Sequence, residues 1–406
     1  MSRFDPPWLH EPAVQRLLAA LTTAGIEARF VGGCVRDTLL GISGGDIDLA
    51  APAPPDAVIA ALKQAKVKTV PTGLAHGTVT AVVPPRTFEI TTLRRDVETD
   101  GRHAVVAFGA GWAEDAARRD FTINAIYLDA EGTLYDPVGG RADLAAKRVR
   151  FVGDPATRIA EDVLRVLRYY RFEARFGSGE GDAAARAACR DAVPQLATLS
   201  AERVSREFIR LLVASDPIRA LAMMRDDGVL SSIVPEATRI DRLERLQSLA
   251  GGLPTDALLR VAALIEVDKS GAIALAARLR LSNAERGRLA GLASPWPDLG
   301  GDPKAQRLSL YGLGKERHRD LALLSAAEGR IALPRLRDLL ELAETWPIPA
   351  LPLGGDDVTA LGVPPGPQVG RLLGAVKGWW EDGDFTAARG ECLVRLRYLV
   401  RDERGR

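Results

Sequence analysis

The sequence predicts an α/β domain at the start of the chain, followed by a long region built only from helices. Two observations support this fold class. Over the first 150 residues, short β-branched runs alternate with segments of helical periodicity. From about residue 155 onward the chain is rich in Ala, Leu and Arg, with breaks at Gly and Pro and no convincing strand. We therefore expect an α/β domain over 1–150, a first helical region over 151–235 and a second over 236–406.

The composition excludes several classes of protein. With 47% hydrophobic and 26% charged residues, the 406-residue chain is typical of a globular protein of two or more domains. No stretch approaches the roughly 20 apolar residues of a membrane span, and the first residues lack the apolar core of a secretory signal. We expect a cytoplasmic protein without membrane contact. Three isolated cysteines and four scattered histidines argue against a disulfide framework, a cysteine zinc site and histidine-based metal hydrolysis.

The α/β domain is expected to begin with a helix over 11–24. Strands are predicted at 28–31, 46–50, 77–83 and 86–93, with a helix over 55–65 between the second and the third. The last two strands lie close enough in sequence to be antiparallel neighbours. Residues 94–115 are polar and punctuated by glycine, so we expect a long loop with little order there.

The stretch "FVGGCVRDTLLG" (30–41) is predicted to be a strand, a glycine pair and a helix start. Gly32 and Gly33 allow a sharp turn that leaves backbone N–H groups open at a helix N-terminus, where they can cradle a phosphate. Arg36, one turn further on, can add a charged fork to the same anion. The alternative is an ordinary tight turn with a surface arginine.

The stretch "GGDIDLA" (44–50) carries a carboxylate pair. Asp46 and Asp48 are two residues apart, so in a strand they point to the same face, whereas Ile47 and Leu49 point into a core. Two neighbouring carboxylates repel one another, and a divalent cation such as Mg²⁺ relieves this repulsion. The alternative is a polar strand face. Glu89, in the later strand, is either a third carboxylate of this site or a solvent-facing residue.

The stretch "ARRDFTINAIYLD" (117–129) places Arg119, Asp120 and Asn124 around an apolar set. Asp120 and Asn124 are four apart and share a face if they lie on one helical turn. A carboxylate with an amide suits ribose hydroxyls, and Arg119 suits a triphosphate. The alternative is a capped helix start with an exposed Asp–Arg pair.

The stretch "EDVLRVLRYYRF" (161–172) is expected to belong to one amphipathic helix. Its polar face carries Asp162, Arg165, Arg168 and Arg171. A solvated face would explain the pattern, but not the excess of arginine. The net charge is only +1, so a nucleic-acid partner would have to be held by such local patches.

Asp162 and Arg165 together match the pairing edge of two bases. Cytosine and adenine both present an amino donor beside a ring-nitrogen acceptor, so the carboxylate can accept from the first while the guanidinium donates to the second. Guanine and uracil present the opposite order. One Asp/Arg couple therefore admits CTP and ATP, rejects GTP and UTP, and needs no nucleic-acid template.

These stretches, in this order, resemble the class II CCA-adding enzymes, which are tRNA nucleotidyltransferases, and the related bacterial poly(A) polymerases. The matching pieces cover about the first half of the chain: "GGCVRDTLLG", "GDIDLA", "RRDFTINA", "DPVGGRADL" (136–144), "EDVLRVLR" and "AERVSREFIRLL" (201–212). The resemblance implies a head over 1–150 with the nucleotidyltransferase fold of the DNA polymerase β type. It also implies a helical neck over 151–235 that recognises the base, and a helical body and tail over 236–406 that bind RNA.

The resemblance also implies roles for individual residues. Gly33 and Arg36 would hold the triphosphate, and Asp46 and Asp48 would be the catalytic carboxylates that bind Mg²⁺. Arg119 would contact the nucleotide, with Asp120 and Asn124 near the ribose. Asp162 and Arg165 would read the base, and Arg168 and Arg171 would line the same pocket. In the family, "DPVGGRADL" is a hinge between head and neck, and "AERVSREFIRLL" is a helix that supports the neck.

The implied function is addition of C, C and A to the 3′ end of tRNA from CTP and ATP, with release of pyrophosphate. No obligate protein partner is inferred. The nearest alternative is a poly(A) polymerase, or an enzyme that adds only part of CCA, although the short C-terminus of mixed charge, "LRYLVRDERGR", favours CCA addition. A catalytically inactive RNA- or nucleotide-binding protein is the alternative from another class, and the intact pair Asp46 and Asp48 argues against it. Nucleotide transfer to a small molecule would not require so long a helical region.

Overall fold

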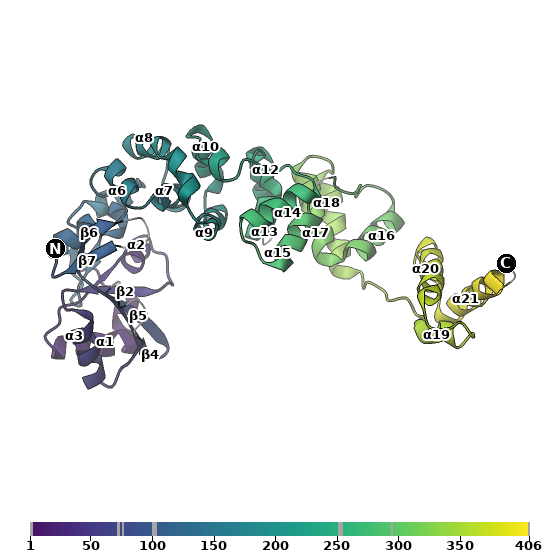
Figure 1. Cartoon of the computed structure of the whole chain (residues 1–406), viewed down its shortest axis with the longest axis horizontal. Helices are drawn as coiled ribbons and strands as arrows, with labels where there is room; N and C mark the ends of the chain where they lie inside the picture. The colour runs from purple at the N-terminus through teal and green to yellow at the C-terminus, as the bar shows by residue number, and fades with distance from the viewer. Residues whose placement is uncertain are drawn as a thin grey trace. The chain divides into compact units, whose positions relative to one another are not determined.

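The computed structural model describes residues 3–70, Leu74, 77–99, 104–250, 255–293 and 295–404. The chain divides into two compact units, Met1–Pro235 and Glu236–Arg406. The first unit holds all the strands of the described chain, and the second is helical (Figure 1). This confirms the predicted fold class, a mixed-sheet head followed by helices.

A seven-stranded sheet organises the start of the first unit. Its strand order is β3-β4-β5-β2-β1-β8-β9, and β2 and β5 are its parallel pair, whereas the other neighbours run antiparallel. The strands are β1 (Arg29–Val31), β2 (Ile47–Ala51), β3 (Lys68–Val70), β4 (Thr78–Val83), β5 (Arg86–Thr92), β8 (Tyr127–Leu128) and β9 (Leu134–Tyr135). The four predicted strands are β1, β2, β4 and β5, and the last two are antiparallel as expected.

Short helices surround this sheet. They are η1 (Pro7–His10), α1 (Pro12–Thr23), α2 (Gly33–Leu39), α3 (Pro55–Gln64), η3 (Thr122–Asn124) and α5 (Gly140–Ala145). Helices α1 and α3 pack against each other and against β4 (Figure 1). Leu17 and Leu21 of α1 and Leu62 of α3 are fully buried in this contact layer. Hydrophobic burial of this kind fixes the sheet that carries the predicted site.

The prediction of a long loop over 94–115 is wrong. Strands β6 (Arg94–Thr99) and β7 (Ala104–Phe108) form an antiparallel two-stranded sheet, and α4 (Trp112–Ala117) follows. The glycines that suggested a loop, Gly109 and Gly111, instead separate β7 from α4, where Gly111 is the N-cap. The run "AVVAF" is rich in β-branched residues, which explains the strand. Residues 100–103 lie outside the described part of the chain.

The prediction that residues 161–172 belong to one helix is also wrong. Helix α6 (Pro155–Glu161) ends before Asp162, whose backbone is extended at φ −155° and ψ 105°, and α7 (Leu164–Phe176) begins after it. The Asp162 carboxylate accepts a hydrogen bond from the Leu164 amide at 3.1 Å, so its side chain satisfies a free N–H at the new helix start. An aspartate therefore makes this break, without glycine or proline.

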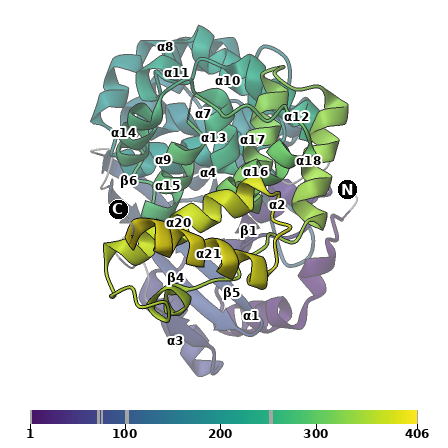
Figure 2. The same ribbon diagram turned by 90° about the vertical axis from the view of Figure 1, so that its right-hand side faces the viewer.

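The remaining described elements are helices, as predicted. In the first unit they are α8 (Ala183–Asp191), η4 (Val193–Thr198), α9 (Ala201–Leu212), α10 (Pro217–Asp226) and α11 (Val229–Ile233). In the second unit they are α12 (Ile240–Ala250), α13 (Ala257–Leu264), α14 (Lys269–Arg278), α15 (Asn283–Gly291), α16 (Pro303–Leu313), α17 (Lys315–Ala327), α18 (Leu333–Thr345), α19 (Gly355–Thr359), α20 (Pro367–Asp382) and α21 (Arg389–Arg404). Helices α20 and α21 lie side by side around a core that includes Val376 and Leu396 (Figure 2). Of the helices described, none is both long and apolar enough to cross a membrane.

Candidate nucleotide site

Three carboxylates meet at the centre of the sheet. Ile47 and Leu49 of β2 are buried and Asp48 between them is partly exposed, as the alternation predicts, whereas Asp46 is exposed and lies just before β2. Because β2 and β5 are parallel, Glu89 lies directly opposite Asp48 in the register. The neighbouring strand thus brings up the third carboxylate, and the sequence left this position open.

The environment of Asp48 is suited to a cation. Burial raises the pKa of this carboxyl, and the nearby charges of Glu89 and Asp46 raise it further, whereas Arg119 lowers it, so that the pKa is about 6. A divalent cation would relieve both the repulsion and the burial cost. Within the described residues, no three His, Cys, Asp or Glu side chains form a complete metal site.

The glycine pair forms the predicted turn between β1 and α2. Gly32 has φ 79°, in the left-handed region that favours glycine, and it precedes the first residue of α2, Gly33. A Cβ added at Gly32 would lie 4.0 Å from Nη1 of Arg119, so this arginine approaches the turn closely. The turn and Arg119 therefore lie together, as expected for two parts of one anion site.

The Arg36 guanidinium does not lie exposed beside the glycine turn, as a direct contact with the anion would suggest. Its side chain is buried and donates to Oδ1 of Asn124 and, from Nε, to Asp37 at 2.7 Å. Its guanidinium also lies 4.2 Å from the centre of the Phe176 ring. Arg36 thus links the glycine turn to α7 and to the "RRDFTINA" segment.

Arg118 and Arg119 are held by a residue that sequence reasoning missed. Asp115, which is 1% exposed, accepts hydrogen bonds from both guanidinium groups and from the Tyr127 hydroxyl. The two arginines line a cavity of about 270 Å³ together with Gly32, Asp48 and Glu89. The only sequence signal for Asp115 is its spacing, three and four residues before the arginines.

Asp120 and Asn124 are brought together as predicted. Oδ1 of Asp120 accepts from Nδ2 of Asn124 at 2.9 Å, and its other oxygen accepts a bidentate pair from Arg168. Burial alone would raise the pKa of Asp120, but Arg168, Asn124 and the Phe121 amide lower it to about 2. Together with the bond from Arg36 to Asn124, these contacts form one network between α2, η3 and α7.

The side chains of Asp162 and Arg165 are not paired with each other in this structure, although the Arg165 amide donates to the Asp162 carbonyl oxygen at 2.9 Å. Asp162 accepts from Nη2 of Arg203 at 2.6 Å. Arg165 donates to Glu161 and, at 2.8 Å, to the carbonyl oxygen of Arg158. Each predicted base reader therefore has its own anchor.

The arginine row of α7 is matched by carboxylates from other elements. Arg168 pairs with Asp120, and Arg171 pairs with Glu207 of α9. Arg175 pairs with Asp37 of α2 at 3.0 Å. The arginines thus tie α7 to its neighbours, which accounts for an excess that a solvated face left unexplained.

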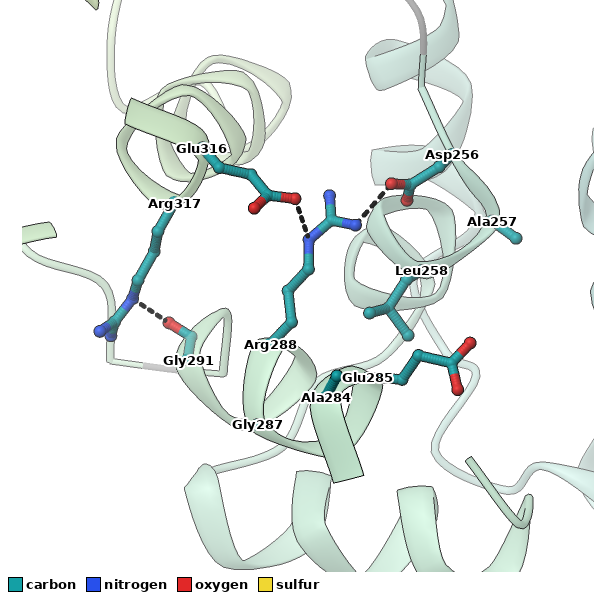
Figure 3. Close-up of a pocket in the computed structure, with 10 residues that line it drawn as sticks. All are labelled: Asp256, Ala257, Leu258, Ala284, Glu285, Gly287, Arg288, Gly291, Glu316 and Arg317. Atoms are coloured by element: carbon teal, nitrogen blue, oxygen red, sulfur yellow. Dashed lines mark hydrogen bonds and ion pairs between the residues drawn. The ribbon is translucent and has the colours of Figure 1, made fainter. Parts of the chain in front are cut away.

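A larger cavity, of about 620 Å³, lies in the second unit between α13, α15 and α17 (Figure 3). Its charged lining comprises three carboxylates and two guanidinium groups: Asp256, Glu285, Glu316, Arg288 and Arg317. Arg288 is already paired with Asp256, Asp320 and Glu316. This acidic balance disfavours a triphosphate, whereas the charged lining of the first cavity, Asp48, Glu89, Arg94, Arg118 and Arg119, has a net positive sign.

The fold and the site define a nucleotidyltransferase. Residues 28–150 match the family described as the poly A polymerase head domain. Residues 182–240 match a second family, described as the probable RNA and SrmB-binding site of polymerase A. Both matches fall within the first 240 residues of the chain, where the predicted motifs also lie.

Similarity to known proteins extends over most of the chain. It is 32% identical over 376 residues to the mouse protein "CCA tRNA nucleotidyltransferase 1, mitochondrial", covering 91% of this chain and 86% of the relative. It is 33% identical over 370 residues to the CCA-adding enzyme of Lacticaseibacillus paracasei, covering 89% of each. The crystal structure of the Bacillus stearothermophilus CCA-adding enzyme in complex with CTP superposes with a TM-score of 0.77 at 28% identity, covering 97% of this chain and 99% of that one. The chain belongs to the family of CCA-adding tRNA nucleotidyltransferases.

Proposed function

We propose that this protein adds C, C and A to the 3′ end of tRNA from CTP and ATP, releasing pyrophosphate, without a nucleic-acid template. The observation that carries the proposal is the pairing of Asp48 with Glu89 in register, beside the Gly32 turn and Arg119. A carboxylate site next to a phosphate-binding turn is the combination that nucleotidyl transfer requires. Family membership supports tRNA as the acceptor.

Mg²⁺ is the metal that we propose for this site. Asp46 and Asp48 would hold it, with Glu89 beside them, because all three offer the hard oxygen ligands that this ion prefers. The raised pKa of Asp48 supports this proposal, since a buried carboxylate among like charges is stabilised by a cation. When bound, the metal supplies Lewis acidity that activates the attacking 3′-hydroxyl and stabilises the leaving pyrophosphate.

The residues of the chain itself bind and orient the nucleotide. The backbone N–H groups after Gly32 and the guanidinium of Arg119 would hold the triphosphate. Gly33 starts the helix at this point, and Arg36 would add positive charge from behind the turn. Asp120 and Asn124 would contact the ribose, and their network with Arg168 keeps them in one orientation.

Base selection would come from Asp162 and Arg165. A carboxylate has about four acceptor positions, and a guanidinium has five N–H donors. Asp162 can therefore accept from a base amino group while it keeps Arg203, and Arg165 can donate to a ring nitrogen while it keeps Glu161. These anchors orient the two readers and leave hydrogen-bonding capacity for cytosine or adenine. Arg168 and Arg171 would form the wall of the same pocket.

The proposal is tested with purified protein, Mg²⁺ and tRNA that lacks its CCA end, with each triphosphate supplied alone. We expect two additions with CTP, none with UTP or GTP, and none with the Asp48→Asn variant. A long adenosine tail with ATP alone would show a poly(A) polymerase. CTP binding without any incorporation would show a catalytically inactive binding protein.

Three further expectations stay predictions. The first is the boundary between head and neck near residue 150. The second is RNA binding by the body and tail over 236–406. The third is the cytoplasmic location, for which the names of the relatives give no single compartment, since the mouse protein is named as mitochondrial.

A further inference from the structure

We propose that Asp115 is a positioning residue that holds Arg118 and Arg119 at the wall of the nucleotide cavity, so that both guanidinium groups face the triphosphate. The inference rests on the proposed function, because it assumes a nucleoside triphosphate in this cavity. Asp115 does not itself line the cavity, whereas both arginines do. It would therefore act through them and would not touch the substrate.

The hydrogen bonds of Asp115 fix both arginines at once. Its Oδ1 accepts from Nε and Nη2 of Arg118, at 2.9 and 2.6 Å. Its Oδ2 accepts from Nε and Nη2 of Arg119, at 3.1 and 2.9 Å. Each guanidinium thus uses one edge for Asp115, which sets the plane of the group and leaves its remaining N–H donors for another partner.

Tyr127 completes the arrangement from the sheet. Its hydroxyl donates to Oδ2 of Asp115 at 2.8 Å and accepts from Nε of Arg119 at 3.2 Å. Tyr127 belongs to β8, which pairs with β1, the strand that leads into the Gly32 turn. The same sheet therefore fixes the positions of both Arg119 and the phosphate-binding turn.

The carboxylate of Asp115 stays charged in this environment. Burial would raise its pKa, but Arg119, Arg118 and the Tyr127 hydroxyl lower the pKa below its usual value. A charged carboxylate in contact with two guanidinium groups weakens the positive field that reaches the triphosphate. The negative charge of Asp115 therefore reduces the attraction of the triphosphate to the cavity. The orientation that Asp115 gives to the two arginines offsets this loss.

The same chain contains a matched control. Asp227, which is 4% exposed, accepts from Nε and Nη2 of Arg186, from Nη1 of Arg190 and from the Tyr170 hydroxyl, at 2.8–2.9 Å. It has the same set of partners as Asp115, two arginines and a tyrosine. It belongs to the helical part of the first unit and does not line the nucleotide cavity. Substitution of Asp227 therefore reproduces the loss of a buried ion cluster without changing the arginines of the cavity.

The Asp115→Asn variant distinguishes two effects of Asp115 on triphosphate binding: the orientation of the two arginines and its own negative charge. Removal of a negative charge near Arg118 and Arg119 would by itself strengthen the binding of a triphosphate. Loss of orientation would weaken that binding, because the charge-assisted hydrogen bonds from the two guanidinium groups to the phosphates depend on their geometry. The two effects have opposite signs, so the direction of the change identifies the role.

The experiment measures binding of CTP, CMP and inorganic tripolyphosphate to the full-length protein with Mg²⁺, for wild type, Asp115→Asn and Asp227→Asn. We expect Asp115→Asn to weaken the binding of CTP and tripolyphosphate by about tenfold or more, the worth of one charge-assisted hydrogen bond, and to leave CMP binding within about twofold. Asp227→Asn should leave all three unchanged even if it lowers the melting temperature. The assay needs no tRNA, so it is independent of whether CCA addition is the reaction.

Unchanged or tighter CTP binding by a folded Asp115→Asn variant would overturn the proposal. Equal losses of CTP and CMP binding would overturn it as well, because a general disturbance of the site would then explain them. If Asp115→Asn does not fold, Tyr127→Phe carries the test, since it removes one hydroxyl and little volume. In the same binding assay, that variant is expected to weaken CTP and tripolyphosphate about threefold and to leave CMP unchanged, and unchanged CTP binding would count against the proposal.

Discussion

Arg203 of α9 donates to Asp162 across 2.6 Å, and Arg165, three residues after Asp162, donates instead to Glu161. The two residues proposed to read the base are thus anchored separately, from two different directions. The extended backbone at Asp162 makes this possible, because it turns the carboxylate out of the helical row and toward α9. Helix α9 therefore makes a specific contact with one of the two residues that we propose as base readers.

Arg203→Ala is expected to relax base selection. Loss of a charged hydrogen bond to the partly exposed Asp162 should lower kcat/KM for CTP roughly five- to tenfold and leave the low rate with UTP nearly unchanged. The measurement is the ratio of kcat/KM for CTP and UTP. Arg206→Ala, an exposed position on the same helix, is the control. An unchanged ratio in Arg203→Ala would show that Asp162 needs no anchor.

Binding of Mg²⁺ should stabilise the protein through Asp48. When the metal exceeds its Kd ten- to hundredfold, the gain in unfolding free energy is about 1–3 kcal/mol, which thermal unfolding detects as a higher melting temperature. Asp48→Asn should abolish this gain, and Asp56→Asn, at an exposed site on α3, should retain it. Because the pKa of Asp48 is about 6, protons compete with the metal below that pH, so the gain should shrink at pH 5. A full gain in Asp48→Asn would place the metal elsewhere.

Arg168→Ala should be strongly destabilising. It leaves Asp120 charged, buried and without its ion-pair partner, which costs about 3–5 kcal/mol in comparable cases. Arg175→Ala breaks a more exposed pair with Asp37 and should cost less than about 1 kcal/mol. Chemical denaturation of both variants measures the difference. Similar costs for the two would mean that the Asp120 network contributes little.

The pH dependence of that stability follows from the lowered pKa of Asp120. A carboxyl with a depressed pKa in the folded state contributes stability above its unfolded value, near 3.8, and this stability is lost as the pH falls through about 2. The difference between wild type and Asp120→Asn should therefore be largest at neutral pH and shrink in acid. A difference that stays constant from pH 7 to pH 2 would contradict this assignment.

His318 of α17 should make the second unit sensitive to mild acid. Its side chain is fully buried, and burial lowers its pKa below 6.5. Near pH 6.5 the unfolded chain then takes up a proton that the folded chain excludes. At lower pH the unfolding free energy therefore decreases, by at most about 1.4 kcal/mol per pH unit. His318→Leu should reduce this loss in melting temperature between pH 6.5 and pH 5, and His10→Gln, at an exposed site, should not. Identical pH profiles for wild type and His318→Leu would contradict the prediction.

Much of the head could be predicted because its signals are local. The alternation in "GGDIDLA" buries Ile47 and Leu49 and turns Asp48 to the other face, and a pair of glycines marks the turn before α2. Asp120 and Asn124 meet as their four-residue spacing indicates, although the backbone between them is a 3₁₀ turn. In each case the residues that decide the structure are neighbours in the sequence.

The features that were left open or missed depend on residues far apart in the chain. Glu89 is placed opposite Asp48 by a parallel pairing that no short pattern reveals. Asp115 owes its setting to Tyr127, on a strand of two residues that was too short to predict. The break at Asp162 was hidden because aspartate at a helix start is ordinary, and only its contacts with Leu164 and Arg203 show that a new helix begins there.

The most direct test of the central claim is the product formed when all four triphosphates compete. Purified protein with Mg²⁺ and tRNA lacking its CCA end would receive CTP, ATP, UTP and GTP at equal concentration, and mass spectrometry would read the 3′ end. Base selection by Asp162 and Arg165 predicts two cytidines and one adenosine, followed by a stop. Incorporation of uridine or guanosine at comparable rates, or a long adenosine tail, would contradict it.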